Sequence, residues 1–524
     1  MTESPISANH QIARAAGTVM FAIILGQLAG LARGILIARA FPAAQLDAFF
    51  AANRVSETLF VLIAAGALGS AFIPTFTGLL ATDRRAAAWR LASALANLIV
   101  LGLSLLALLA ALLAPQIVKY LLAPGLSRDP ALFALTVALL RIQLASSVLF
   151  GLGGLAVGIL NAHQVFLVPA LAPSMYQFGM IFGVLVLAPH MGIYGLAWGV
   201  VAGAAAYLLL QIPSLLNKQA AYTATLGLGE AAVREVVRLM GPRVLGVAVV
   251  QLNFWVNTWL ASQMAAGSVA GLQYGFSLML MAQAAIAQSV AIAAMPTFSA
   301  QHALGRVDEM RASLAAALRG VLLLAIPASA GLMLLREPIV TALYQRGQFD
   351  ARMTALAAWA LLWFAAGLVG HSVMEVLTRA FYAQHDTSTP VVIGTAAMGL
   401  NVLFSFSFSA YFAAIGWMPH GGLALANSLA TALEMTALLL MMRRRLGGLE
   451  GNQVGQAAWQ AALGALAMWV IVWIWLRAPL PAWLLTLAGV TTGGGIYLLV
   501  LWGLNVPELR ALLAAVRRRL LRPL

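Results

Sequence analysis

The sequence predicts an all-α polytopic membrane protein with about 14 transmembrane helices, in two pseudo-symmetric six-helix lobes plus two extra C-terminal helices. Its composition, its long apolar runs and an internal repeat support this fold class. Of 524 residues, 62% are hydrophobic and 9% are charged, and the mean hydropathy is +0.93. An ordinary soluble domain is about half apolar and about a quarter charged. The composition excludes a soluble enzyme, a disordered chain and a nucleic-acid-binding protein, although the net charge is +14.

A transmembrane helix needs about 20 predominantly apolar residues. Runs of this kind follow one another along almost the whole chain, and the second is either one span or two joined segments. The polar residues before the first run, and its length, favour an uncleaved span over a signal peptide. The runs lie at 16–38, 50–80, 87–115, 131–160, 165–188, 192–216, 238–262, 268–298, 313–335, 353–383, 388–413, 420–442, 455–476 and 481–504.

Lysine and arginine residues indicate the orientation, because cytoplasmic loops carry an excess of them. With the N-terminus inside, about 20 basic residues fall on the cytoplasmic side and about 7 on the other side by the positive-inside rule. We therefore expect both termini in the cytoplasm and an even number of spans. The basic, leucine-rich segment 510–524 is expected to lie on the inner leaflet.

The chain resembles itself at an offset of about 222 residues, a pattern typical of transporters built from repeats. The matching segments are 71–76 (AFIPTF) with 293–298 (AAMPTF), 161–164 (NAHQ) with 382–385 (YAQH), and 195–197 with 422–424 (both GLA). The repeated unit has six helices, so both copies insert in the same orientation and are related by an axis along the membrane normal. This architecture suits alternating access around a shared cavity.

The repeat predicts the division of the chain. The expected parts are a cytoplasmic N-terminal segment at 1–15, an N-lobe of helices 1–6 at 16–218, a C-lobe of helices 7–12 at 219–447, helices 13–14 at 448–505, and a basic cytoplasmic tail at 506–524.

Charged residues inside the spans are candidate functional residues, since a charge near the bilayer centre costs at least about 2.5–3.5 kcal/mol. Arg33, in the outer half of the first span, either lines a cavity for an anionic substrate or extends to the outer surface. Arg141 lies deep in the fourth span with no acidic neighbour in sequence, which makes it a second cavity candidate. Asp47, just before the second span, either caps that helix or takes part in function.

Two further pairs have helical spacing. Arg54 and Glu57 are three residues apart and share a helix face, where they form either a mutually neutralising pair or a gate. His371 and Glu375 are four residues apart in the tenth span, where they form either a proton relay or a buried hydrogen-bonded pair.

The sequence has no motif of a known catalytic centre. It contains no cysteine, no GxxxxGK[ST] loop for ATP and no HExxH zinc motif. We therefore expect a transporter without catalytic residues, bound metal or cofactor.

Several segments resemble the MurJ/MviN family of lipid II flippases, within the multidrug/oligosaccharidyl-lipid/polysaccharide exporter superfamily. The matching segments are 379–390 (RAFYAQHDTSTP), 47–50 (DAFF), 69–74 (GSAFIP), 240–242 (MGP) with 245–247 (LGV), 267–269 (GSV), 343–349 (LYQRGQF) and 443–447 (RRRLG). The resemblance runs in register from about residue 18 to residue 447. It implies fourteen helices, with the last two forming a groove for a lipid tail.

The resemblance also bears on the binding residues. Arg33 matches one of the family's cavity arginines, and Arg54 and Arg141 fall where the family often has a basic residue. Other family positions for charged residues hold Gln27, Phe60, Ala65, Gly34 and the pair Phe276 and Ser277. The expected substrate-binding set is therefore Arg33, Arg54, Arg141, Asp47 and Glu57, with His371 and Glu375 as the relay or gate.

The function that the resemblance implies is the translocation of lipid II, a polyprenyl-pyrophosphate-linked peptidoglycan precursor, from the inner to the outer leaflet of the bacterial cytoplasmic membrane. The alternatives are export of another lipid-linked glycan or of a small molecule, and a non-transporting cell-wall scaffold. The expected partners are a lipid-linked anionic substrate and the bilayer, without nucleic acid, and a monomer is favoured. The membrane potential is the expected driving force, at about 2.3 kcal/mol per charge per 100 mV. The sequence assigns no coupled ion.

Overall fold

The computed structural model describes residues 25–63 and 72–510, and every regular element in these ranges is a helix. Contacts divide the chain into two units, one comprising Met1–Val269 with Arg346–Phe349 and the other Ala270–Gln345 with Asp350–Leu524. The predicted N-terminal segment 1–15, the start of the first span at 16–24 and the tail residues 511–524 lie outside the described ranges. The lobe boundary at 218/219 concerns the sequence repeat and stays a prediction.

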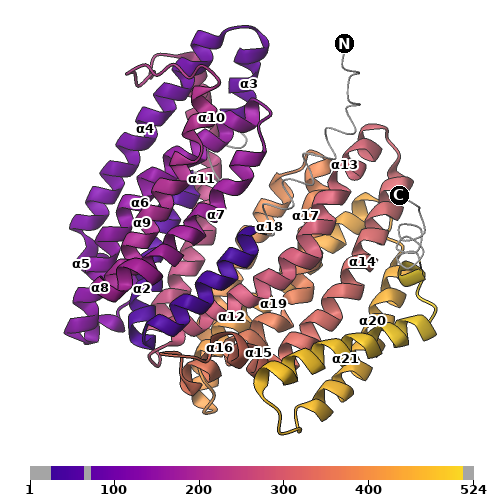
Figure 1. Cartoon of the computed structure of the whole chain (residues 1–524). Helices are drawn as coiled ribbons and strands as arrows, with labels where there is room; N and C mark the ends of the chain where they lie inside the picture. Colours follow the sequence, from indigo (N-terminus) through magenta and orange to yellow (C-terminus); the bar gives the residue numbers. More distant parts are fainter. Residues whose placement is uncertain (1–24, 64–71, 511–524) are drawn as a thin grey trace, which may run out of the picture. The chain divides into compact units, whose positions relative to one another are not determined.

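The first unit is a bundle of long helices with several short helical segments between them, and the long connection 217–230 joins α10 to α11 (Figure 1). It begins with helical residues 25–40. Its other helices are α2 (Ala43–Ile63), α3 (Ile73–Ala81), α4 (Arg85–Leu112), α5 (Ala114–Gln116), the π-helix η2 (Ile117–Leu122), the 3₁₀ turn η3 (Leu126–Arg128), α6 (Pro130–Ala162), α7 (Leu167–Phe182), the π-helix η4 (Gly183–Leu187), α8 (Ala188–Met191), α9 (Ile193–Leu209), α10 (Ile212–Leu216) and α11 (Ala231–Ser262).

The second unit is also helical, and its first helix begins at the end of the first unit. Its helices are α12 (Ser268–Gln283), the π-helix η5 (Ala284–Gln288), α13 (Ser289–Ala303), α14 (Val307–Leu334), α15 (Arg336–Tyr344), α16 (Ala351–Ala366), α17 (Leu368–Ala383), α18 (Ser388–Ala414), α19 (His420–Arg445), α20 (Gly451–Trp475) and α21 (Ala482–Gly503).

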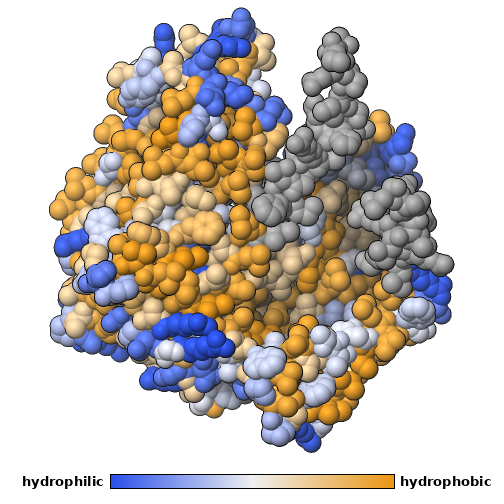
Figure 2. Space-filling view, in the orientation of Figure 1, coloured by the Kyte–Doolittle hydropathy of each residue, from blue (hydrophilic) through white to orange (hydrophobic). Residues whose placement is uncertain are grey.

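The helices have the length and polarity of membrane spans. Within the described ranges, 10 helices are long and apolar enough to cross a bilayer, or up to 12 if each of two bent pairs is one span. On the face shown in Figure 2, apolar residues cover the middle of the first unit's helices and hydrophilic residues gather toward their ends. The all-α polytopic fold class is confirmed. The count of 14 stays a prediction, because the first two expected spans include residues 16–24 and 64–71, which are not described.

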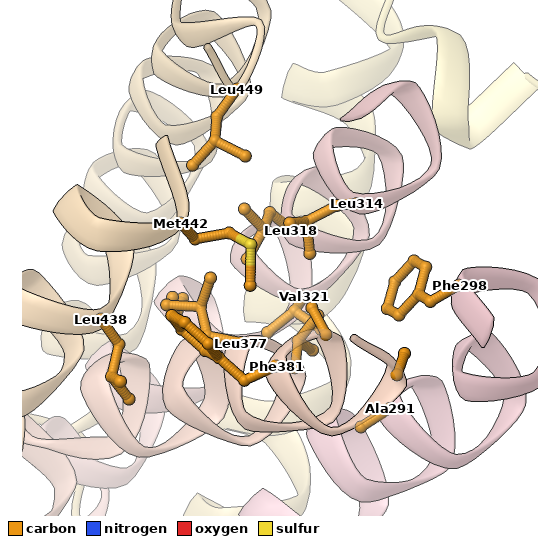
Figure 3. Packing of buried hydrophobic residues seen from close by; sticks show 14 of the residues in the cluster. Ala291, Phe298, Leu314, Leu318, Val321, Leu377, Phe381, Leu438, Met442 and Leu449 are labelled. Atoms are coloured by element: carbon orange, nitrogen blue, oxygen red, sulfur yellow. The ribbon is translucent and has the colours of Figure 1, made fainter. Parts of the chain in front are cut away.

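Small residues permit close packing between helices, which matters because lipid supplies no hydrophobic driving force between spans. In the first unit, a Cβ atom on Gly179 of α7 would lie 2.1 Å from the Cα atom of Gly203 on α9, so only glycine fits there. In the second unit, Figure 3 shows large apolar side chains from α14, α17 and α19 meeting, including Leu318, Leu377 and Leu438. Both bundles therefore have interiors of packed side chains.

The last two helices are attached to α14. The Tyr497 hydroxyl on α21 donates a hydrogen bond to the Leu323 carbonyl on α14 at 2.5 Å. One turn earlier on α14, Arg319 pairs with Glu508 at 2.7 Å and with Glu450 at 3.6 Å. These contacts fix α20 and α21 to the second unit.

Turns at the helix ends agree with the sequence repeat. Gln164 and His385 both have φ 59°, and they lie 221 residues apart. Asp83 (φ 56°) and Gly305 (φ 68°) lie 222 residues apart. Because few non-glycine residues adopt positive φ, this recurrence supports a structural repeat at the predicted offset.

Candidate functional site

Arg33 lies on the helix at 25–40 and faces α7. Its Nη1 donates to the sulfur of Met180 at 3.9 Å, and its buried Nε has no hydrogen-bond partner. Gly30, three residues earlier, lies beside Gln177 of α7, whose side chain would be 3.8 Å from a Cβ at that position. A half-buried guanidinium with an unsatisfied N–H retains donor capacity for an anion.

Arg54 forms the predicted pair with Glu57 on α2. Its Nη1 lies 3.0 Å from the Glu57 carboxylate, and its guanidinium lies over the Phe254 ring of α11, 4.9 Å from the centroid. Thr58, one turn further along α2, accepts a hydrogen bond from the Trp255 indole at 2.9 Å. The predicted ion pair is therefore present, and its role as a neutralising pair or as a gate stays a prediction. The Phe254 ring of α11 provides a further contact for the arginine.

Tyr176 of α7 connects these groups. It shares a side-chain hydrogen bond with Asn53 of α2 and interacts electrostatically with Arg33, Arg54 and Glu57. The structure thus brings together Arg33, Asn53, Arg54, Glu57 and Tyr176, which we call the arginine cluster. Sequence reasoning missed Asn53 and Tyr176. The sequence gives only a weak indication that these two residues belong to a binding site, because neutral polar residues in spans often only join helices.

Asp47 does not cap α2, because that helix begins at Ala43 and Asp47 lies in its second turn. Only 2% of Asp47 is exposed, and its carboxylate accepts a hydrogen bond of 2.6 Å from the backbone N–H of Gly267. The cap prediction was wrong because the helix starts at Ala43, about two turns before the apolar run at 50–80 begins. Asp47 instead joins α2 to the turn between α11 and α12.

Arg141 lies on the exposed side of α6. Its Nε donates to the Ala111 carbonyl at 3.1 Å, in the last turn of α4. The last carbonyls of a helix lack intrahelical partners and attract cations. The structure places Arg141 at a helix end and gives it no contact with the arginine cluster.

His371 and Glu375 have different partners and do not bond to each other. The His371 Nε2 lies 3.1 Å from the Asn427 Oδ1, and the Thr431 hydroxyl is 3.4 Å from the same nitrogen. Glu375 instead pairs with Arg379 at 3.1 Å. The prediction of a direct pair was wrong because each side chain has a better partner, on α19 for the histidine and one turn along α17 for the glutamate.

Across the part of the chain that the structure describes, no three His, Cys, Asp or Glu side chains form a metal-binding group.

Comparisons with known proteins agree on one family. Residues 37–489 match the family described as Lipid II flippase MurJ. The lipid II flippase MurJ of Burkholderia cenocepacia is 31% identical over 441 residues, which cover 82% of this chain and 84% of the relative. The probable lipid II flippase MurJ of Vibrio cholerae is 28% identical over 511 residues, covering 93% and 95%.

Solved structures share the fold. A lipid II flippase MurJ in an inward closed conformation matches with a TM-score of 0.80 at 23% identity, over 92% of this chain and 97% of the other. An inward-facing multidrug resistance transporter of the MATE family matches with a TM-score of 0.70 at 14% identity, over 81% and 95%.

Proposed function

The chain belongs to the lipid II flippase MurJ family, and we propose from this premise that it moves lipid II from the inner to the outer leaflet of the bacterial cytoplasmic membrane. The match over residues 37–489 carries the proposal, since it includes both units. Export of another glycan or of a small molecule, and a scaffolding role, are not favoured by these relatives.

The arginine cluster is the proposed contact for the pyrophosphate of the head group. Guanidinium groups bind phosphate through short, charge-assisted hydrogen bonds. Arg33 offers an N–H without a partner, and Arg54 offers a guanidinium shared with Glu57. Because Glu57 competes with phosphate for Arg54, binding of the head group exchanges one anionic partner for another. Such an exchange allows release as well as capture.

Arg141 and Asp47 take other roles in this proposal. Arg141 stabilises the end of α4, and Asp47 holds α2 against the turn before α12. The substrate-binding set is thereby narrowed to Arg33, Arg54 and Glu57.

No ATP site is needed for such transport. Moving a net negative charge outward is favoured by about 2.3 kcal/mol per 100 mV of inside-negative potential. Transport also requires that the inward- and outward-open states bind the substrate differently, since a ligand with equal affinity for both shifts nothing. We therefore infer alternating access driven by the membrane potential, without a cofactor.

Helices α20 and α21 are the proposed path for the lipid tail. Their tryptophans support the membrane placement, because indole rings collect at bilayer interfaces. Trp473 is stacked with the Arg477 guanidinium, 3.6 Å from the ring centroid, and Trp475 donates to the Thr492 hydroxyl at 3.0 Å. With both termini inside, this tryptophan group lies at the outer interface.

Reconstituted transport tests the proposal. Proteoliposomes containing the purified protein and fluorescent lipid II on one leaflet should transfer the label to the other leaflet, as measured by quenching from outside. A matched control is Arg128→Ala, in the loop before α6. Absence of transfer by correctly folded wild-type protein, together with failure to support growth of a bacterium depleted of its own flippase, would reject the function.

A further inference from the structure

Glu434 is an acidic residue near the middle of α19. It lies 14 residues from His420 and 11 from Arg445, the ends of that helix. At 1.5 Å per residue, these separations are about 21 Å and about 17 Å. The packed neighbour α18 contains no charged residue at all. A carboxylate at this depth is expensive unless it has a partner or a function.

Glu434 is half-buried and lies on the same face of α19 as residues of the second unit's apolar core. Asn427, Thr431, Glu434, Leu438 and Met442 follow one another at spacings of four, three, four and four residues, so they share one face of α19. Leu438 and Met442 have no exposed surface and pack in the apolar core shown in Figure 3. The opposite face of the helix carries the exposed Leu433 and Leu440.

A glycine on α18 makes room for this side chain. A Cβ atom on Gly394 would lie 3.0 Å from the Glu434 Oε1, so a larger residue would push the carboxylate away. The polar residues of the same α19 face, Asn427 and Thr431, contact His371 of α17. On this face of α19, Glu434 therefore lies between the polar pair Asn427 and Thr431 and the apolar pair Leu438 and Met442.

Among the residues that the structure describes, Glu434 has no hydrogen-bond or ion-pair partner. The charged groups on the helices around it are engaged or distant. On α17, Glu375 and Arg379 pair with each other, and His371 is bonded to α19. On α16, the only charged residue is Arg352, in the first turn, and α19 itself has only His420 and Arg443–Arg445 at its ends.

The chemistry around Glu434 suits a proton better than a metal ion. Calcium takes six to eight oxygen ligands, and magnesium demands near-octahedral geometry. No cluster of three metal-ligating side chains occurs in the described ranges, and the α18 backbone beside the carboxylate is that of a glycine, which has no side chain to act as a ligand. The Glu434 side chain is half-buried. A carboxylate that is partly removed from water and has no cationic partner is less costly when it carries a proton.

We propose that Glu434 is a proton-binding site that couples inward proton movement to outward lipid transport. This proposal rests on the proposed function. A proton from water on the outer side binds a Glu434 carboxylate oxygen, is carried as the neutral acid, and is released to water on the inner side. One proton moves per cycle, and no other bond is made or broken.

The test compares wild type with Glu434→Gln, which mimics the protonated form, and with Glu434→Asp, which keeps a carboxyl group. Glu309→Gln, an exposed carboxyl at the start of α14, is the matched control. In proteoliposomes without a membrane potential, the outer-to-inner ratio of labelled lipid II should rise up to about tenfold per pH unit of outside acidity in wild type and in the control. Glu434→Gln should show no rise, whereas Glu434→Asp should retain part of it.

A second readout is independent of transport. Infrared difference spectra of the reconstituted protein should show a protonated carboxylic acid band that changes with pH and is missing in Glu434→Gln. The coupling is overturned if the outer-to-inner ratio of labelled lipid II does not change with the pH gradient in wild type, or if it changes as strongly in Glu434→Gln. Identical pH-dependent spectra of wild type and Glu434→Gln overturn the site itself. If wild type moves no lipid II but shows the band, the proposed function fails while the proton site stands.

Discussion

The hydrogen bond between Asp47 and Gly267 predicts how rarely α2 separates from the turn between α11 and α12. The Asp47→Ala substitution removes a carboxylate that is 2% exposed and leaves the Gly267 N–H, 2.6 Å from it, without an acceptor. A hydrogen bond to a charged group contributes about 1.5–3 kcal/mol. At about 1.4 kcal/mol per factor of ten, loss of this bond should raise the fraction of molecules in which α2 has separated from the turn by about 10- to 150-fold. We call this separated form the open arrangement.

Cysteine labelling measures this population directly, because the natural chain contains no cysteine. Ser268 follows Gly267 and has no exposed surface, so Ser268→Cys should react slowly with a membrane-impermeant maleimide. When opening is fast and rare, the labelling rate follows the open fraction. Adding Asp47→Ala should therefore accelerate labelling by about 10- to 150-fold. Asp47→Asn, which keeps a neutral acceptor, should have a smaller effect.

The matched control is Glu337→Ala, which removes a carboxylate whose side chain is 68% exposed and should leave labelling unchanged. The reasoning fails if Asp47→Ala labels within twofold of the parent while its thermal midpoint is preserved. That result would mean that the Gly267 contact does not restrain opening.

Three further predictions concern separate parts of the chain. Arg33→Ala should lower lipid II transfer at least about tenfold with an unchanged thermal midpoint, since a charge-assisted bond contributes about 1.5–3 kcal/mol; normal transfer would show that Arg33 does not meet the head group. Gly347→Ala should lower the thermal midpoint, because Gly347 has φ 63° and a Cβ there would lie 2.5 Å from the Arg39 carbonyl oxygen; an unchanged midpoint would contradict this. Asp386→Asn should lower stability at neutral pH, and its difference from wild type in denaturant unfolding should shrink as the pH falls below about 4; a constant difference would contradict the assignment.

The direction of the pH dependence expected for Asp386→Asn follows from the groups around the Asp386 carboxylate. Desolvation alone would raise the pKa of this carboxyl, but hydrogen bonds from Thr389, Ser388 and Arg445 outweigh it and hold the pKa well below its usual range. A carboxyl with a depressed folded-state pKa stabilises the protein above its unfolded pKa, and this stabilisation is lost as the pH falls toward the folded value. Asparagine lacks the charge at every pH, so the two proteins converge in acid.

The spans could be predicted from the sequence because lipid requires every spanning segment to be long, apolar and helical. Their boundaries were harder to predict. The apolar run at 50–80 did not reveal that α2 begins at Ala43, because the polar residues there are compatible with a helix that starts outside the hydrocarbon. The bend of 47° between α16 and α17 also has no signal in hydropathy.

Site residues could be predicted only where the partner is local. The Arg54–Glu57 pair follows from a spacing of three residues on one helix. The partners of Asp47 and Arg141 are 220 and 30 residues away, and the sequence contains no rule that selects them. Glu434 was not predicted, although a lone charge in an apolar run is itself a signal, because no charged residue lies three or four positions away to form a pair.

Two of the motifs that make the family recognisable in this chain form hydrogen bonds that stabilise turns. In the segment 379–390, the Asp386 carboxylate accepts from the Thr389 N–H at 2.9 Å and from Arg445 at 2.5 Å, which joins the turn before α18 to the end of α19. In the segment 343–349, the Gln348 N–H donates to the Arg39 carbonyl at 3.0 Å. These hydrogen bonds hold the backbone of the turns and do not involve the substrate. The turns can therefore be the same in two proteins whose cavities carry different charged residues. The neutral residues at the family's other arginine positions therefore do not argue against the fold. They place more of the pyrophosphate binding on Arg33 and Arg54, so replacing both arginines should abolish transport even if either single variant retains some.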